Sequence, residues 1–374
     1  MNGNCGLDNQ VEVYVSVIIP VFNCEKYLLR CLQTLQKQTL ENFEVIMVDD
    51  GSTDGSNQIC VEFQERDRRF RLYQQNRQFA GAARNFGIEH SRGEYLLFLD
   101  SDDFFSPELL EKSYRIAKKS KADVCVFGAN SFDDQTSEVR LMKNACECDK
   151  NTGGSFLSLT ENADHIFDFT ISAPWNKIFR RNFIVERNIR FQKILNANDV
   201  CFVLTALATA NYICVDPQPL IYYRINHGTS LQQSKDKDPT CICEALLGLQ
   251  QELIQRDLFG LTKASFMKLV VSHCIGNLRS VKTKKGFKKL YEHINSNLIP
   301  KLRFDGEATE LSLSCKKVLQ WNDLSKLSPE EYIKKYSYFE FTGKSFQITS
   351  YERLRVMFIK YLTRVERAVF SKLG

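Results

Sequence analysis

Two short acidic stretches of the chain have the residue types and spacing of a site that binds metal or phosphate. The stretch "LDSDD" places carboxylates at Asp100, Asp102 and Asp103, directly after an apolar run. The stretch "VDDGSTDGS" places Asp49 and Asp50 after another apolar run. Such carboxylates suit a hard divalent cation that bridges to phosphate oxygens, because these cations prefer oxygen ligands. The simpler alternative is a pair of solvated turns that cap the following helices.

A basic segment lies between the two acidic stretches. The sequence "GAARNFG" carries Arg84 among small residues, and its glycines allow a close approach of the backbone. Arg84 could face a phosphate or form a salt bridge to one of the nearby aspartates, and both interpretations stay open. Two acidic clusters together with this cation favour a phosphate and metal site over two unrelated helix caps.

These residues must be positioned by the regular elements that precede them. Continuous apolar runs, typical of strands buried on both faces, occupy 13–22, 43–50 and 94–103. Further strand patterns lie at 70–75 and 122–129, and helical patterns lie at 25–38, at 79–91, at 107–120 and over a stretch ending near Arg66. This alternation predicts an α/β fold with a mainly parallel sheet and helices on both faces. Ligands bind outside the carboxyl ends of such strands, where the acids lie.

The strand and helix alternation weakens beyond residue 130. Residues 160–230 contain a short helix, the helical pattern "NDVCFVLTALATA" and the strand pattern "PLIYYRI". Helical patterns dominate beyond about residue 236. The sequence therefore predicts an α/β domain over 1–235, with halves at 14–130 and 160–230, followed by a mostly helical region over 236–374.

Composition excludes several classes of protein. The chain has 374 residues, is 43% hydrophobic and 25% charged, and carries a net charge of only +5, which does not favour nucleic-acid binding. Its 13 cysteines are scattered without metal-binding spacing, so we expect free thiols in a reducing cytoplasm. No signal-peptide or membrane-spanning pattern is recognised.

The last 31 residues concentrate the positive charge. Residues 344–374 hold seven Lys or Arg and two Glu, a net charge of +5, on a helical pattern of apolar residues. Such a helix suits contact with an anionic membrane surface, here the inner face of the membrane. The alternative is a helix that packs on its own domain or on a partner in a homodimer.

The motifs, taken together and in order, resemble family 2 glycosyltransferases of the GT-A fold. The resemblance rests on "VSVIIPVFNCEKYLLRCLQTLQKQT", "FEVIMVDDGSTDGS", "GAARNFGI", "RGEYLLFLDSDDFFSPELLE" and "PWNKIFRRNFI". It is dense over 14–128 and recognisable to about residue 230. It implies an enzyme of bacterial surface polysaccharide synthesis that takes a sugar from a nucleotide diphosphate sugar, with UDP as the nucleotide. The resemblance also implies Mn²⁺ or Mg²⁺ and a glycan or lipid-linked acceptor.

The resemblance also implies roles for individual residues. Pro20, Phe22, Asn23 and Glu25 would line the pocket for base and ribose, and Asp50 would accept the ring N–H of the base. The other substrate-binding positions that it implies are Arg84, Asp100, Asp102, Trp175, Lys177 and Arg224. The metal ligands that it implies are Asp102, Asp103 and His227. A plain surface connection at 222–230 is the alternative for Arg224 and His227.

The general base implied by the resemblance is Asp199, which would take the acceptor proton in a single inverting displacement. Family members commonly carry Glu-Asp here, whereas this chain has Asn198 before Asp199. Asp199 could instead be an N-terminal cap of the helix. Two other functions compete with transfer of a sugar. One is a nucleotidyltransferase of similar architecture, and the other is a relative that binds sugar nucleotide without catalysis.

Overall fold

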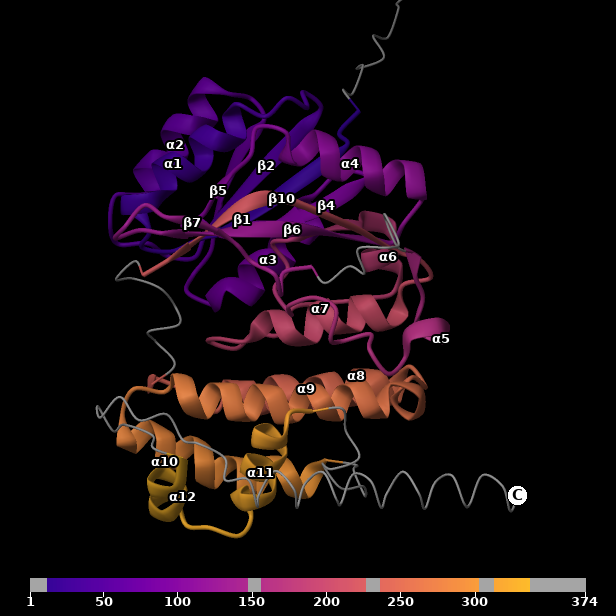
Figure 1. Cartoon of the computed structure of the whole chain (residues 1–374). Coiled ribbons are helices and arrows are strands. Elements are labelled where there is room, and N and C mark those ends of the chain that lie inside the picture. Colours follow the sequence, from indigo (N-terminus) through magenta and orange to yellow (C-terminus); the bar gives the residue numbers. More distant parts are fainter. Residues whose placement is uncertain (1–11, 147–155, 227–235, 303–312, 337–374) are drawn as a thin grey trace, which may run out of the picture. The chain divides into compact units, whose positions relative to one another are not determined.

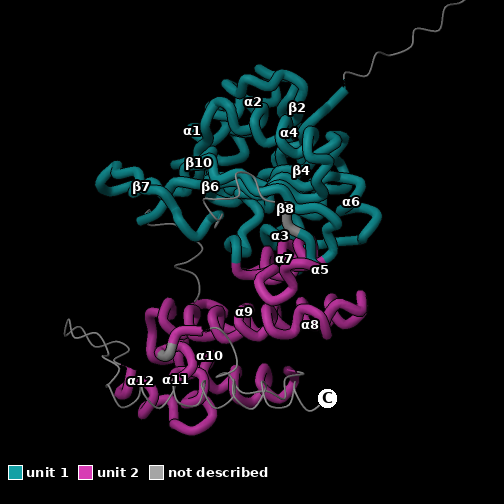
Figure 2. The backbone as a smooth tube through the Cα atoms, turned by 45° about the vertical axis from the view of Figure 1, so that its right-hand side comes forward, with its two compact units in different colours: residues 1–159, 169–193, 209–227 teal, residues 160–168, 194–208, 228–374 magenta. Residues whose placement is uncertain are grey.

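The computed structural model describes four stretches of the chain, residues 12–146, 156–226, 236–302 and 313–336. The chain divides into two compact units (Figure 2). Unit 1 comprises residues 1–159, 169–193 and 209–227, and unit 2 comprises 160–168, 194–208 and 228–374. Two short segments from the region predicted as the first domain, 160–168 and 194–208, therefore group with the helical part of the chain.

Unit 1 is built on one mixed sheet (Figure 1). Its strands are β1 Val15–Val21, β2 Phe43–Asp49, β3 Phe70–Gln74, β4 Tyr95–Phe98, β5 Phe104–Phe105, β6 Val124–Asp133, β7 Val139–Leu141, β8 Phe156–Leu157, β9 Lys177–Arg180 and β10 Ile213–Ile225. The main order is β3-β2-β1-β4-β9-β6-β10-β5, with β7 paired to β6 and β8 to β10. The pairs β3–β2, β2–β1, β1–β4 and β6–β10 are parallel. The short strand β9, which the sequence did not predict, is antiparallel to both β4 and β6.

Helices cover both faces of this sheet, as predicted. The helices of this part of the chain are α1 Glu25–Gln36, α2 Ser56–Arg66, α3 Phe79–His90, α4 Leu109–Ser120 and α6 Arg181–Glu186. The short helix α5 Leu159–Asn162 starts at the last residue of this part of unit 1 and continues into unit 2. Figure 1 shows α1, α2 and α4 along one face and α3 against the other. Gly87 brings α3 close to β1, since a Cβ there would lie 2.4 Å from Ile18 Cγ2. The small residues of "GAARNFG" thus place α3 directly on the sheet.

The core of unit 1 follows from the apolar strand sequences. Every residue of β2 is buried, and so is every residue of β1 except the partly buried Pro20. Alternate β1 residues, among them Val17 and Ile19, share one cluster with Leu28 and Leu32 of α1. Ile18 points to the opposite face and meets α3. Because both faces are covered, the strands carry no alternating polar residues.

Unit 2 is helical in its described residues. It contains α7 Asn198–Thr209 (all but its last residue), α8 Cys241–Gln255, α9 Phe259–Ser280, α10 Lys284–His293, the π-helical turn Ile294–Leu298, the 3₁₀ turn Ile299–Lys301, α11 Cys315–Leu324 and α12 Pro329–Tyr336. The apolar faces of α8 and α9 pack together, and α11 packs on α9. Where the chain is described, none of its helices is both long enough and apolar enough to span a bilayer.

One buried carboxylate ties β1, β2 and β3 of unit 1 to the residues that lead into β4. Glu44 accepts hydrogen bonds from Ser16 Oγ at 2.7 Å, Arg92 N at 2.7 Å and Arg71 Nη1 at 3.0 Å. Burial raises the pKa of Glu44, but the hydrogen bonds from Ser16, Arg92 and Arg71 outweigh it and leave the pKa lowered. The native state therefore prefers the ionised form of Glu44 more strongly than the unfolded state does.

We expect Glu44→Gln to lower the free energy of unfolding by about 2 kcal/mol, because charge-assisted hydrogen bonds from both arginines are weakened. Stability from a lowered pKa is present above the unfolded value of 4.5 and is lost as pH falls through the folded value. The difference in unfolding free energy between variant and wild type, measured by urea unfolding, should therefore be large at pH 7 and much smaller at pH 3. Glu62→Gln, which removes an exposed pair with Arg66, is the control and should stay near wild type. Equal stability of Glu44→Gln and wild type at pH 7 would contradict this account.

Candidate functional site

The carboxyl ends of β1, β2 and β4 meet at one edge of the unit 1 sheet. The register pairs Val21 with Asp49 and Ile18 with Phe98. Asp50 N donates to Val21 O at 2.9 Å, so the turn after β2 lies beside the end of β1. The two acidic stretches found in the sequence therefore follow strands that flank the same central strand.

Asp100, Asp102 and Asp103 bring their carboxylates together in the loop after β4. One oxygen from each lies within 4.8 Å of the others, so the three could hold a metal ion. Asp103 is buried, whereas Asp100 and Asp102 are partly exposed. This arrangement matches the predicted spacing of a divalent-cation site.

Asp103 is the most constrained of the three acids. Its Oδ1 accepts from Arg224 N at 2.8 Å, but its buried Oδ2 has no hydrogen-bond partner among the described residues. Burial and the charges of Asp102 and Asp100 raise the pKa of Asp103 well above its ordinary value, and the nearby Arg224 opposes them only partly. A buried acceptor without a partner costs free energy that a cation at this position would offset.

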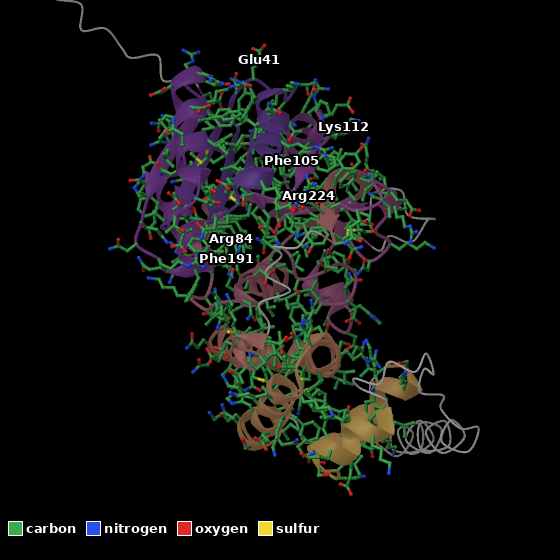
Figure 3. All side chains as sticks on the ribbon, turned by 90° about the vertical axis from the view of Figure 1, so that its left-hand side faces the viewer. Glu41, Arg84, Phe105, Lys112, Phe191 and Arg224 are labelled. Atoms are coloured by element: carbon green, nitrogen blue, oxygen red, sulfur yellow. The ribbon has the colours of Figure 1, made fainter. Side chains whose placement is uncertain are left out.

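Arg84 forms a salt bridge to Asp100, which is one of the two interpretations that the sequence allowed. Its Nη2 lies 2.6 Å from Asp100 Oδ1, and its guanidinium lies 5.3 Å from the centre of the Phe191 ring. Figure 3 labels Arg84 and Phe191 next to each other. Only 7% of the Arg84 side chain is exposed. The cation therefore neutralises part of the acidic cluster and fixes the position of Asp100, while its contact with a nucleotide stays a prediction.

Arg224, on β10, holds the acidic loop from the other side. Its Nε donates to Asp102 O at 2.8 Å, and its backbone N donates to Asp103. Its guanidinium also pairs with Asp134, which the sequence did not identify, and lies 4.8 Å from the centre of the Tyr27 ring. The predicted phosphate-binding cation is thus buried beside the acids. His227, the metal ligand predicted nearby, lies outside the described residues.

Asp50 organises the start of α3. Its Oδ1 accepts from Gln75 Nε2 and Gln78 N at 2.7 Å, and its Oδ2 accepts from Arg77 Nη1 and Phe79 N at 2.8 Å. Phe79 has a left-handed backbone with φ 70°, which is strained for a bulky residue. The four bonds to Asp50 hold this conformation. Because a carboxylate accepts about four hydrogen bonds, a base that binds Asp50 must replace a side-chain donor, Gln75 or Arg77.

Arg77 is a site residue that the sequence analysis missed. Its guanidinium stacks 3.2 Å from the centre of the Phe22 ring while it pairs with Asp50. Phe22 is 38% exposed, so the predicted base-binding ring presents one face to Arg77. In the sequence, Arg77 is a single cation shortly after the predicted strand at 70–75. Such a residue cannot be told from an ordinary surface arginine by sequence alone.

Asn23 and Glu25 tie the loop after β2 to the end of β1. Asn23 Oδ1 accepts from Thr53 N at 2.8 Å, and Glu25 Oε2 accepts from Gly55 N at 2.6 Å. Asp49 Oδ1 accepts from Ser52 N at 3.0 Å, so Asp49 supports the turn after β2. Pro20, in β1, is only partly buried. The pocket-lining role of Pro20, Asn23 and Glu25 stays a prediction.

Trp175 and Lys177 are both buried in unit 1. Trp175 stacks on Tyr223, with 5.2 Å between ring centres. Lys177 Nζ donates to Thr170 Oγ1, to the carbonyls of Ile171 and Ala173 and to Asn176 Oδ1, at 2.7–3.0 Å. The ammonium group thus uses its three protons within the protein and fixes the loop before β9. A substrate-binding role for either residue stays a prediction.

Asp199 lies in unit 2, in the first turn of α7. It is partly exposed, and Asn198 beside it is buried. Ala197, directly before the helix, has a left-handed backbone with φ 57°, a conformation that costs free energy for a residue other than glycine. The helix start that the sequence predicted is confirmed, and the catalytic role of Asp199 stays a prediction.

Residues 16–187, which include all of the unit 1 acids described above, match the model of the glycosyl transferase family 2. This part of the chain is similar to family 2 glycosyltransferases. EpsH of Bacillus subtilis (strain 168), described as a glycosyltransferase, is 32% identical over 227 residues, which are 60% of this chain and 64% of EpsH. Glycosyltransferase GlyG of Streptococcus pneumoniae serotype 4 is 40% identical over 121 residues, which are 32% of this chain and 40% of GlyG. The chain thus spans less than two thirds of either relative.

The fold of the chain also resembles a solved structure. TarS residues 1–349 from S. aureus, in complex with UDP-GlcNAc, superimpose with a TM-score of 0.65 at 21% identity. The similarity covers 86% of this chain and 89% of TarS 1–349. It confirms the predicted GT-A fold followed by a helical C-terminal region.

We expect Lys177→Met to lower the free energy of unfolding by about 3 kcal/mol. The substitution leaves buried acceptors of Thr170, Ile171 and Asn176 without their donor. Thermal unfolding would measure the loss, and Lys37→Met, at an exposed position, is the control. UDP affinity of the folded variant should stay close to wild type. A stable variant that has lost UDP binding would instead make Lys177 a substrate ligand.

Proposed function

We propose that the protein transfers a sugar from a UDP-sugar to a hydroxyl of a glycan or a lipid-linked acceptor in surface polysaccharide synthesis, with inversion at the anomeric carbon. The observation that carries this proposal is the acidic cluster after β4, where buried Asp103 Oδ2 has no partner among the described residues. The match of residues 16–187 to glycosyl transferase family 2 and the UDP-GlcNAc bound to TarS support a sugar nucleotide as the donor.

The acidic cluster fits a divalent cation, Mn²⁺ or Mg²⁺. Three carboxylates with oxygens within 4.8 Å repel one another, and Arg84 and Arg224 compensate only part of their charge. Asp102 and Asp103 would hold the ion, with Asp100 kept in place by Arg84. A bound cation would supply positive charge to the diphosphate that leaves during transfer.

The cationic side chains around the cluster keep it assembled before substrate arrives. Arg224 is fixed by Asp134, by Asp102 O and by the Asp103 carboxylate that its backbone N–H contacts. Such preorganisation lets a site stabilise developing negative charge without first rearranging its dipoles. Arg224 would therefore both position the acids and add positive charge near the leaving group.

The base of the donor would bind between Phe22 and Asp50. An imide N–H, as in uracil, can donate to a carboxylate, and an aromatic ring can stack on the base. In the structure, Arg77 forms an ion pair with Asp50 and stacks on the Phe22 ring. Donor binding would therefore displace Arg77 from Asp50, from Phe22 or from both, which makes this arginine part of the donor site.

Asp199 would take the proton from the acceptor hydroxyl. A carboxylate in the first turn of a helix keeps its anionic form, because the helix dipole is positive there. The proton passes to the carboxylate as the hydroxyl oxygen attacks, and the bond from the sugar to the diphosphate breaks on the opposite side. A relative that binds donor without catalysis remains the second candidate, since Asn198 stands where family members commonly carry Glu.

We expect UDP binding to depend on the divalent cation. Calorimetry with Mn²⁺ should give a dissociation constant at least tenfold lower than calorimetry in EDTA. In Asp103→Asn the dissociation constant for UDP should be the same with Mn²⁺ and in EDTA, because the amide removes a charge and one acceptor from the cluster. Asp133→Asn, at a partly exposed carboxylate on the end of β6, is the control and should retain the difference. Equal affinity with and without metal in wild type would remove the metal site from the proposal.

We expect Asp199→Asn to retain UDP binding and to lower transfer at least a hundredfold, since general base catalysis contributes 10²–10⁴-fold. Release of UDP from a UDP-sugar in the presence of an accepted glycan would measure transfer. Glu186→Gln, at an exposed carboxylate of α6, is the matched control. Turnover within a few-fold of wild type would make Asp199 a helix cap, and failure of all variants and wild type to turn over would favour the non-catalytic alternative.

A further inference from the structure

The helix α10 of unit 2 carries a dense set of lysines that no step of the proposed reaction uses. The stretch 281–289, "VKTKKGFKK", contains five lysines and no acid. Gly286, Phe287, Leu290 and Tyr291 form the buried side of the helix. The lysines all lie on the exposed side, at positions 282, 284, 285, 288 and 289.

These charges are only partly compensated. Lys288 lies 3.9 Å from Glu292 and 3.7 Å from Glu330, and Lys289 lies 3.4 Å from Asp238. Within the described part of the chain, no acid lies at ion-pair distance from Lys284 or Lys285. Both residues are in the first turn of α10, where the helix dipole disfavours cations, so their charges do not stabilise the helix.

The basic helix α4 of unit 1 provides a comparison. Lys112, Arg115 and Lys118 of α4 are paired with Glu108, Glu111 and Glu94 at 2.5–2.7 Å. Three cations of α4 are thus paired with acids, whereas Lys284 and Lys285 of α10 have no acid at ion-pair distance among the described residues. This contrast between α4 and α10 indicates that the lysines of α10 contact negative charge on another molecule.

The same face is hollowed. A shallow depression of about 430 Å³, largely open to solvent, is lined by Lys285, Lys288, Lys289, Glu292, His293 and Ser296. Of its three lysines, Lys288 and Lys289 have acids at 3.4–3.9 Å, and Lys285 has none at ion-pair distance among the described residues. Because lysines are flexible point charges without the fixed fork of arginine, they suit several phosphate groups at variable positions more than one precisely oriented ligand.

We propose that the lysine face of α10 binds the anionic headgroups of a phospholipid surface. Clusters of four or more lysines on an amphipathic helix attract anionic lipid, and each contributes on the order of 1 kcal/mol near the surface, or roughly fivefold in affinity. The exposed side of α10 carries no apolar residue, so this contact is electrostatic and reversible and does not insert into the bilayer. The binding is independent of sugar transfer and of the donor site in unit 1.

Co-sedimentation of the full-length chain with phosphatidylglycerol vesicles at low salt tests the proposal. The variant Lys284→Gln, Lys285→Gln, Lys288→Gln should bind these vesicles about a hundredfold more weakly than wild type. The control Lys37→Gln, Lys118→Gln, Lys119→Gln removes equal charge from exposed positions of unit 1 and should bind like wild type. An unchanged thermal unfolding midpoint would show that the α10 variant is folded.

Four results would overturn the proposal. If the wild-type protein does not bind phosphatidylglycerol vesicles, it has no such lipid-binding surface. If the α10 variant binds these vesicles as strongly as wild type, the lipid contact lies elsewhere in the protein. Equal binding to phosphatidylcholine vesicles would exclude charge as its cause. Release of wild type from the vesicles by micromolar glycerol phosphate would make the hollow a site for a discrete soluble phosphate, while failure of millimolar glycerol phosphate to compete supports the lipid surface.

Discussion

The unit 1 site depends on holding several carboxylates at one sheet edge against their mutual repulsion. Asp50 is held by two backbone N–H groups and by Gln75 and Arg77, while Asp100 is held by Arg84. Asp103 has fewer partners and keeps a buried oxygen without one among the described residues. The acids are therefore satisfied to different degrees, and the least satisfied of them marks where an additional positive charge fits.

The rest of unit 1 can be understood as support for this edge. The parallel order β3-β2-β1-β4 brings the two acidic loops to neighbouring strand ends, and Gly87 seats α3 on the sheet so that Arg84 reaches Asp100. On the other side, β10 carries Arg224 to the loop after β4. The buried ammonium of Lys177 orders the loop before β9, the strand between β4 and β6.

The sequence predicted the elements of unit 1 well because long apolar runs and helical periodicity are local signals. It did not predict β9, because four residues become a strand only through pairing with β4 and β6. The acids after β4 could be found from their spacing. The partners Arg77 and Asp134 could not, since they meet Asp50 and Arg224 from positions 27 and 90 residues away in the chain. Side-chain pairing over such separations leaves no periodic pattern.

The interleaving of the two units has a consequence for biosynthesis. Strand β10 pairs with β6 from Ile213 to Ile225, yet segments 160–168 and 194–208 of unit 2 precede it in the chain. During synthesis from the N-terminus, β6 must wait for β10 while about 80 residues are added, which takes several seconds at ribosomal speed. Until then one apolar edge of the nascent sheet lacks its partner and is open to mispairing. The slowest step in producing this protein is therefore expected to be closure of its sheet by β10, with aggregation of the newly made chain as the competing outcome.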